Sequence, residues 1–295
     1  AGAALARALI LRSTVMCDAY AAASNGVIDF NFDIPCDDDD YGTSKDVNNN
    51  ASITARSAIL SNVILIALVG ALLALIAAVW AAARGEPFLQ AAVVTALPST
   101  LMPVGMSVVP SSMSGAALLA ARFRVSNCRS QDTVIIIVGL VTSIAPIVIV
   151  ALVWWVNVWG DKPQWVREYE PISPQQQQQN ENSARGKVMY ALRRAIHRSW
   201  KWHSADQPTY GTPQSAQVLL LEYRVLWYPS LDAAVLTAVA MLTVVGGLNH
   251  DNIALCRGST AMIIVVLVFQ LIAIPLVQPF TALFSLVAAM TNVAL

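Results

Sequence analysis

Residues that could carry out chemistry are sparse in this sequence, and their spacing matches no catalytic pattern. The three histidines, His197, His203 and His250, fall in polar stretches, and no HExxH zinc motif occurs. The chain also lacks a GxxxxGK phosphate-binding loop, and no Ser-His-Asp arrangement follows from the spacing. We therefore expect no enzymatic activity, no metal and no cofactor.

One ionisable residue, Asp232, lies inside an apolar segment, about one turn after its start. Such residues usually mark a proton or ion pathway. The alternative is an acid near a helix N-terminus, where the helix dipole favours it. A single acid argues against a proton-coupled transporter or a voltage sensor. It leaves open a channel or lipid transporter whose walls are apolar or lined by backbone.

Apolar segments long enough to cross a bilayer dominate the chain. It has 295 residues, of which 56 % are hydrophobic and 12 % charged, and a soluble domain carries about twice that charged fraction. A helix crosses the bilayer core with about 20 apolar residues. The runs are continuously apolar, without the alternation of barrel strands. We expect an all-α polytopic bundle of about five to six transmembrane helices, at about 57–83, 88–121, 133–159, 229–248, 259–277 and 279–295.

Prolines lie in the middle of the second and third of these segments. The stretch 88–121 would form a straight helix of about 51 Å, which exceeds a bilayer core of about 30 Å. Pro98, Pro103 and Pro110 each remove a backbone donor and disturb the preceding turn. We expect a helix over 88–108, bent near Pro98 and Pro103, and a second short piece over 111–121. Pro146 lies in the middle of the third segment.

The region 1–56 is polar and acidic, with eight Asp against four basic residues. We interpret it as a partly disordered extracellular stem. Cys17 and Cys36 are a candidate disulfide that requires this region to be outside the cell, and the alternative is that all four cysteines are free thiols. Asn50 begins an Asn-Ala-Ser glycosylation pattern a few residues before the first membrane segment.

The loop 160–217 combines a low-complexity polyglutamine tract with a basic stretch. Its periodicity over 184–203 predicts an amphipathic helix that lies on an anionic membrane surface, and a solvated basic loop is the alternative. The residues expected to contact anionic lipid headgroups are Lys187, Arg194, Arg198 and Lys201.

Charge asymmetry predicts the orientation of the bundle. The loop 160–217 holds eight basic against five acidic residues, and basic loops favour the cytoplasmic side. Counting back through the segments puts the N-terminus outside, and we expect the plasma membrane as the location. Arg122, Arg124 and Arg129 disagree, because they would lie outside.

Three stretches carry a family resemblance: LPSTLMPVGMSVVPSSMSGAALLAARF, LEYRVLWYPSLDAAVLTAV and LVQPFTALFS. Together they resemble the C-terminal multi-spanning region of the trypanosomatid dispersed gene family surface proteins, over about residues 57–295. The resemblance implies the membrane end of a surface protein with a role in surface exposure or adhesion, and it supplies no catalytic residues. The polyglutamine loop departs from that family. The chain is expected to be a fragment of a longer glycoprotein.

The sequence therefore predicts a non-enzymatic, multi-spanning membrane anchor or interaction region at a cell surface. The alternative is a channel or transporter with an uncharged, proline-kinked pathway. That alternative requires a polar cavity at Ser99, Thr100, Ser107 and Ser111.

Overall fold

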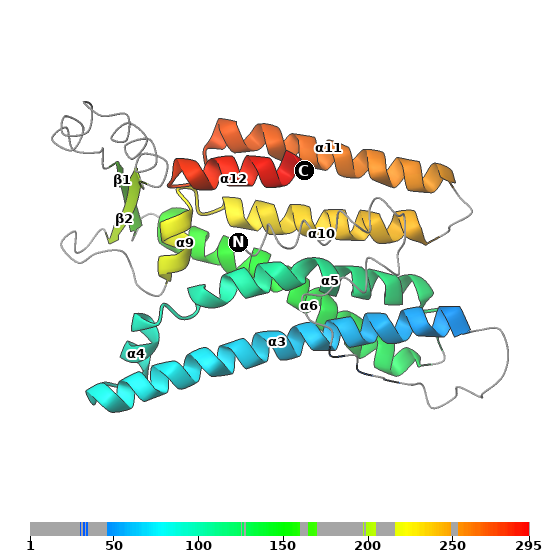
Figure 1. Ribbon diagram of the computed structural model, residues 1–295, viewed down its shortest axis with the longest axis horizontal. Coiled ribbons are helices and arrows are strands. Elements are labelled where there is room, and N and C mark those ends of the chain that lie inside the picture. Colours follow the sequence, from blue (N-terminus) through cyan, green and yellow to red (C-terminus); the bar gives the residue numbers. More distant parts are fainter. Residues whose placement is uncertain are drawn as a thin grey trace, which may run out of the picture. The chain divides into compact units, whose positions relative to one another are not determined.

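The computed structural model describes the residues that form the helical segments and parts of the regions between them (Figure 1). These are residues 30, 32, 34, 46–124, 126, 128–159, 165–169, 197, 199–204, 216–248 and 253–294. In chain order the elements are α3 (Asp46–Arg84), α4 (Phe88–Val94), the 3-10 helix η1 (Ser99–Leu101), α5 (Met102–Arg122), α6 (Arg129–Trp154), the π-helix η2 (Trp155–Trp159), β1 (Trp165–Tyr169), β2 (Trp200–Ser204), α9 (Gln217–Glu222), α10 (Tyr228–Gly247), α11 (Ile253–Val277) and α12 (Leu283–Ala294). The prediction of a predominantly helical chain is confirmed for the described residues.

The chain divides into two compact units. Unit 1 comprises Ala1–Ala74, Leu101–Val148 and Ser230–Phe269, and unit 2 comprises Leu75–Thr100, Ile149–Pro229 and Gln270–Leu295. Unit 1 therefore contains α5 and most of α3, α6, α10 and α11. Unit 2 contains the short helices and the two strands.

Helix α5 forms the centre of unit 1. In the apolar 18-residue stretch of the span that contains α5, 72 % of the residues are buried. The corresponding share is 6 % for the span of α3 and 17 % for the span of α11. One core cluster joins α5 with α3, α6 and α10 through Ile59, Leu119, Ile135 and Val244. A second joins α5 with α10 and α11. Because α5 is surrounded by helices, its serines and glycines lie inside the bundle, while α3 and α11 expose long apolar faces that suit contact with lipid.

Glycines allow the helices of unit 1 to approach closely. A Cβ added at Gly115 on α5 would lie 3.1 Å from the Ala55 carbonyl oxygen on α3. A Cβ at Gly139 on α6 would lie 3.1 Å from both the Ser112 carbonyl oxygen and the Ala116 Cβ on α5. Small residues at such positions are the usual way in which membrane helices bring their backbones together.

In unit 2, a glycine turn ends α3. Gly85 has a φ of 66°, in the left-handed region that glycine adopts without steric cost. The Glu86 N–H donates to the Ala81 carbonyl at 3.1 Å, which is the long hydrogen bond of a Schellman motif. Arg84 in the last turn complements the negative end of the helix dipole.

The path of residues 88–121 differs from the prediction. The helix expected over 88–108 is instead the short α4, followed by a break that contains Ala96, with a φ of 55°, and the cis Leu97–Pro98 bond. Pro103 lies in the first turn of α5, where a missing N–H costs little. Helix α5 then continues through Pro110 as a single element, so the expected separate piece over 111–121 is wrong. Pro146 is likewise inside α6.

Five described helical segments are long and apolar enough to cross a membrane: Ser52–Arg84, Ser99–Arg122, Arg129–Trp159, Tyr228–Gly247 and Ile253–Val277. The fourth agrees closely with the predicted 229–248. Helix α3 begins earlier than expected, so Asn50 lies on a helix just before the first of these segments. The sixth predicted span, 279–295, is replaced by α12 of 12 residues, about 18 Å long and too short for the bilayer core.

The last residues of the predicted amphipathic helix 184–203 form a strand instead of a helix. Residues 200–204 form strand β2, which pairs antiparallel with β1, and Lys201 lies on that strand opposite Glu168. Alternating aromatic residues at Trp200 and Trp202 give this stretch the period of a strand. Lys187, Arg194 and Arg198 lie outside the described residues, as do Cys17, Cys36, the acidic run 37–40 and the polyglutamine tract.

Candidate functional site

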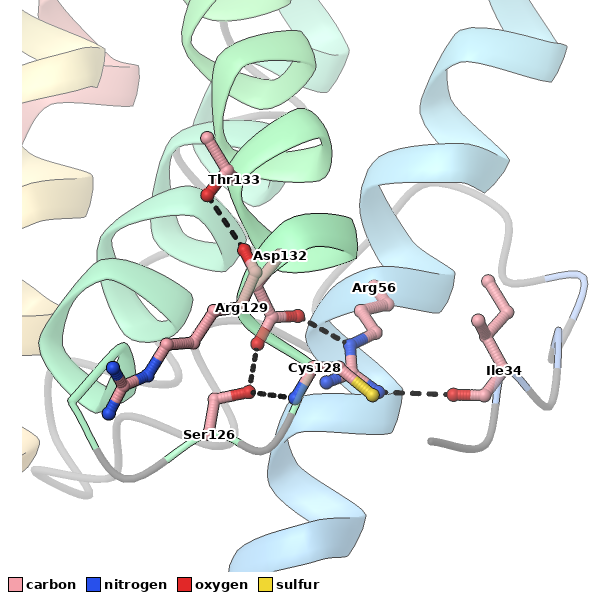
Figure 2. A network of polar contacts seen from close by, with 7 residues as sticks. All are labelled: Ile34, Arg56, Ser126, Cys128, Arg129, Asp132 and Thr133. Carbon is pink, nitrogen blue, oxygen red and sulfur yellow. Dashed lines mark hydrogen bonds and ion pairs between the residues drawn. The ribbon is translucent and has the colours of Figure 1, made fainter. Parts of the chain in front are cut away.

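The most prominent polar feature of unit 1 is a buried ion pair between α3 and α6 (Figure 2). The Arg56 Nε donates to the Asp132 Oδ1 at 2.7 Å, and the two side chains are 3 % and 1 % exposed. A charge buried this deeply needs a partner, because desolvation of an isolated ion is very unfavourable. The pair therefore ties α3 to α6 through residues 76 positions apart in the chain.

The turn before α6 completes the environment of the Asp132 carboxylate. The Ser126 hydroxyl donates to Oδ2, and the same hydroxyl oxygen accepts the Cys128 N–H at 3.2 Å. Figure 2 shows Ser126 and Cys128 gathered beneath the carboxylate. Both carboxylate oxygens are thus engaged, so the group is held in one orientation as an acceptor.

Arg56 also holds a segment that precedes α3. Its Nη1 donates to the Ile34 carbonyl at 3.1 Å. Two residues of the same segment bond to α3: the Phe32 N–H donates to Ser57 Oγ at 2.9 Å, and the Phe30 N–H donates to Ser61 Oγ at 3.1 Å. Both serines are buried. The order of contacts shows that this segment runs antiparallel to the beginning of α3, so this part of the expected stem is attached to the bundle.

No pattern within a single segment predicted this network. The ionisable residue that the sequence indicated inside a membrane segment is Asp232, which is buried in α10. Arg56 directly precedes the charge-free stretch 57–83, and Asp132 directly precedes the charge-free stretch 133–159. Opposite charges at two segment ends that share the same predicted membrane face are the pattern that would have indicated the pair.

A second polar cluster lies deeper in unit 1, between α3 and α5. The Asn62 side-chain amide donates to Ser111 Oγ at 2.7 Å and to Ser112 Oγ at 2.9 Å. All three side chains are buried, and the Asn62 Oδ1 has no hydrogen-bond partner. Side-chain hydrogen bonds of this kind connect helices in an apolar environment.

The hydroxyls that would line a pathway are mostly bonded to backbone. Ser99, Ser107 and Ser111 each donate to the carbonyl three residues earlier, at Ala96, Val104 and Val108 respectively. The Thr100 hydroxyl has no partner. Hydroxyls bonded in this way do not need a water-filled cavity to be satisfied.

The described cysteines and histidines do not gather into a common site. Cys128 and Cys256 are each disulfide-bonded, which excludes four free thiols. His203 on β2 has its Nε2 at 3.9 Å from the Glu168 Oε2. The structure describes His197 but not His250. Within the described part of the chain, no group of three or more His, Cys, Asp or Glu side chains has the arrangement of a metal site.

Comparison with known proteins gives no match. Searches against protein-family models, curated proteins and solved structures each end without a significant similarity. The family resemblance described above stays a prediction, and the function must be argued from the site itself.

Proposed function

We propose that this chain is a non-enzymatic, multi-spanning anchor and interaction region of a cell-surface protein. The observation that carries the proposal is the attachment of residues 30, 32 and 34 to helix α3 through Ser61, Ser57 and Arg56. The family resemblance favours adhesion as the role of the surface protein.

The network suits an anchor because a pulling force on the stem is shared between α3 and α6. A stem joined only to the end of α3 would pull on one terminal turn, which frays easily. Here Arg56 connects the segment to Asp132, and therefore to α6. Force on the stem reaches two helices that pack around α5, so the bundle resists extraction as a unit.

The disulfides support an orientation with the N-terminus outside. Cys128 precedes α6 and Cys256 lies in the first turns of α11, and residues near both belong to the same end of unit 1 as Arg56. Disulfides persist in oxidising compartments. The arginines at 122, 124 and 129 favour the opposite orientation, because basic residues beside a membrane segment prefer the cytoplasmic side.

Labelling of single introduced cysteines tests the orientation. Lys45→Cys, Glu86→Cys and Asn180→Cys are each made with the native cysteines kept, because removing those would break disulfides. We expect a membrane-impermeant maleimide to label intact cells at position 45 above the wild-type level, and positions 86 and 180 only after permeabilisation. Labelling of intact cells at 86 or 180 but not at 45 would reverse the bundle and refute the surface anchor.

A transport assay tests the alternative function. The channel or transporter hypothesis needs a polar pathway through the four hydroxyls of residues 99–111, and three of them donate to the backbone carbonyl three residues earlier. We expect liposomes that contain the protein to release no more ions or small fluorescent solutes than empty liposomes. Flux above that control, abolished by Asn62→Leu in the buried polar cluster, would favour the transport function over the anchor.

A further inference from the structure

Two arginines of unit 2 meet at one aromatic ring. The guanidinium carbon of Arg224 lies 4.2 Å from the centroid of the Trp200 ring, and that of Arg167 lies 5.8 Å from the same centroid. A ring of this kind attracts a cation through its electron-rich face. One ring does not neutralise two charges, so the two guanidinium groups also repel each other.

The β1–β2 ribbon holds these groups in place. Arg167 is opposite Trp202, and Tyr169 is opposite Trp200 on the antiparallel pair. Trp202 is buried, and its indole N–H donates to the Tyr223 carbonyl at 3.0 Å. The ribbon is therefore fixed against the residue that directly precedes Arg224.

Arg224 is held from the other side by the chain after α11. Its backbone N–H donates to the Pro279 carbonyl at 2.6 Å, and its Nη1 lies 3.4 Å from the Gln278 Oε1. Gln278 has a φ of 47°, a left-handed conformation that is uncommon for a residue with a side chain. The guanidinium is thus positioned by two chain segments, which is the usual condition for a binding group.

These charges lack an anionic partner among the described residues. Neither Arg167 nor Arg224 forms an ion pair with a carboxylate there, and the Arg224 Nε is buried without an acceptor. Burial, and then the charge of Arg167, lower the pKa of Arg224 from its ordinary value. A nearby anion would favour the charged form of Arg224 and so offset both unfavourable effects.

The cluster lies where two candidate membrane segments end. Helix α10 begins at Tyr228 and α11 ends at Val277. Arg224 therefore lies a few residues before one span, and Gln278 directly follows another. Tyr223, Tyr228 and Phe280 form a contacting aromatic group beside them. Aromatic residues of this kind mark the level of the lipid headgroups.

We propose that Arg167 and Arg224, beside Trp200, bind the phosphate group of an anionic lipid headgroup. The fork of a guanidinium matches phosphate oxygens, and the orphaned Nε supplies a donor. The inference rests on the proposed orientation, because the loop that carries β1 and β2 then faces the cytoplasmic leaflet, which is rich in anionic lipids.

Retention of lipid by the purified protein tests the site. Wild type, Arg167→Gln and Arg224→Gln are reconstituted in nanodiscs of equal parts phosphatidylglycerol and phosphatidylcholine, extracted in mild detergent, and analysed by native mass spectrometry. Arg84→Gln is the matched control, because Arg84 stacks singly over Trp80 at 4.7 Å. Circular dichroism checks folding, and Arg167 is exposed on its strand, so its replacement leaves the core intact.

We expect wild type and Arg84→Gln to retain phosphatidylglycerol in preference to phosphatidylcholine. Each of the two site variants should weaken that retention about tenfold, because each loses a hydrogen bond between charged groups. Equal retention by all four proteins, or displacement of the lipid by millimolar inorganic phosphate, would overturn the lipid site. Failure of the wild type to enter nanodiscs at all would instead overturn the membrane anchor, so the two failures are distinguishable.

Discussion

Replacing Asp132 by leucine removes the carboxylate that pairs with Arg56 and leaves a guanidinium buried without its counterion. The Ser126 hydroxyl loses its acceptor in the same step. The reciprocal change, Arg56→Met, leaves the Asp132 carboxylate buried and frees the Ile34 carbonyl. The double variant removes both charges and fills the space with apolar side chains of similar length.

The burial of the pair sets the expected magnitude. Exposed ion pairs contribute about 0–1 kcal/mol, but these side chains are only 3 % and 1 % exposed. Removing one member of a buried pair costs about 3–5 kcal/mol, whereas exchanging both for apolar residues is often neutral. The double variant still leaves the Ile34 carbonyl and the Ser126 hydroxyl without their partners, but it leaves no charge buried without a counterion. We therefore expect it to be more stable than either single variant.

Unfolding in mixed micelles measures these differences. The purified protein is titrated with sodium dodecyl sulfate, and loss of helix is followed by circular dichroism for wild type, both single variants and the double variant. Glu86→Gln, in the exposed turn after α3, serves as the control and should change the free energy of unfolding by less than about 0.5 kcal/mol. A cost below about 1 kcal/mol for Asp132→Leu, or a double variant whose loss equals the sum of the singles, would refute the reasoning that the pair is desolvated.

Gly139→Ala and Asn62→Ala test the packing of α5 by the same unfolding titration, with Gly258→Ala as the comparison. Gly139→Ala places a methyl group against a backbone carbonyl and a Cβ of α5 that cannot rotate away, and we expect a loss of about 1–3 kcal/mol. Gly258→Ala on α11 meets nothing within 4 Å and should gain up to about 1 kcal/mol from helix propensity; equal effects at both glycines would contradict the close approach of α5 and α6. Asn62→Ala removes the bonds to two serines of α5 and should cost about 0.6–2 kcal/mol, and an unchanged unfolding midpoint would show that the cluster does not connect the helices.

The amino-acid sequence by itself determined which segments are apolar enough for a membrane. Runs without charge cover most of α3, α6 and α11, and α10 is recognised as an apolar segment that carries one acid, Asp232. The backbone of such a segment is satisfied inside one helix, so its recognition needs no knowledge of its neighbours. A disturbance of the helix near Pro98 follows from a local rule, but the sequence predicted a bend there, and the structure instead ends α4 at Val94 and begins α5 after the proline. The effect of Pro103 and Pro110 does not follow from such a rule, because a proline at a helix start or within a well-packed helix is tolerated when the surrounding helices compensate.

Tertiary structure alone decided the sites. Arg56 and Asp132 are 76 positions apart, and each looks in sequence like an ordinary charge at a segment end. Arg167, Trp200 and Arg224 come from three separate stretches that meet only when β1 pairs with β2 and the ribbon packs on the chain before α10. The composition of a segment indicates whether it is stable in lipid or in water. Which charges become buried together depends on the packing of helices around α5, and no periodicity within one segment encodes that.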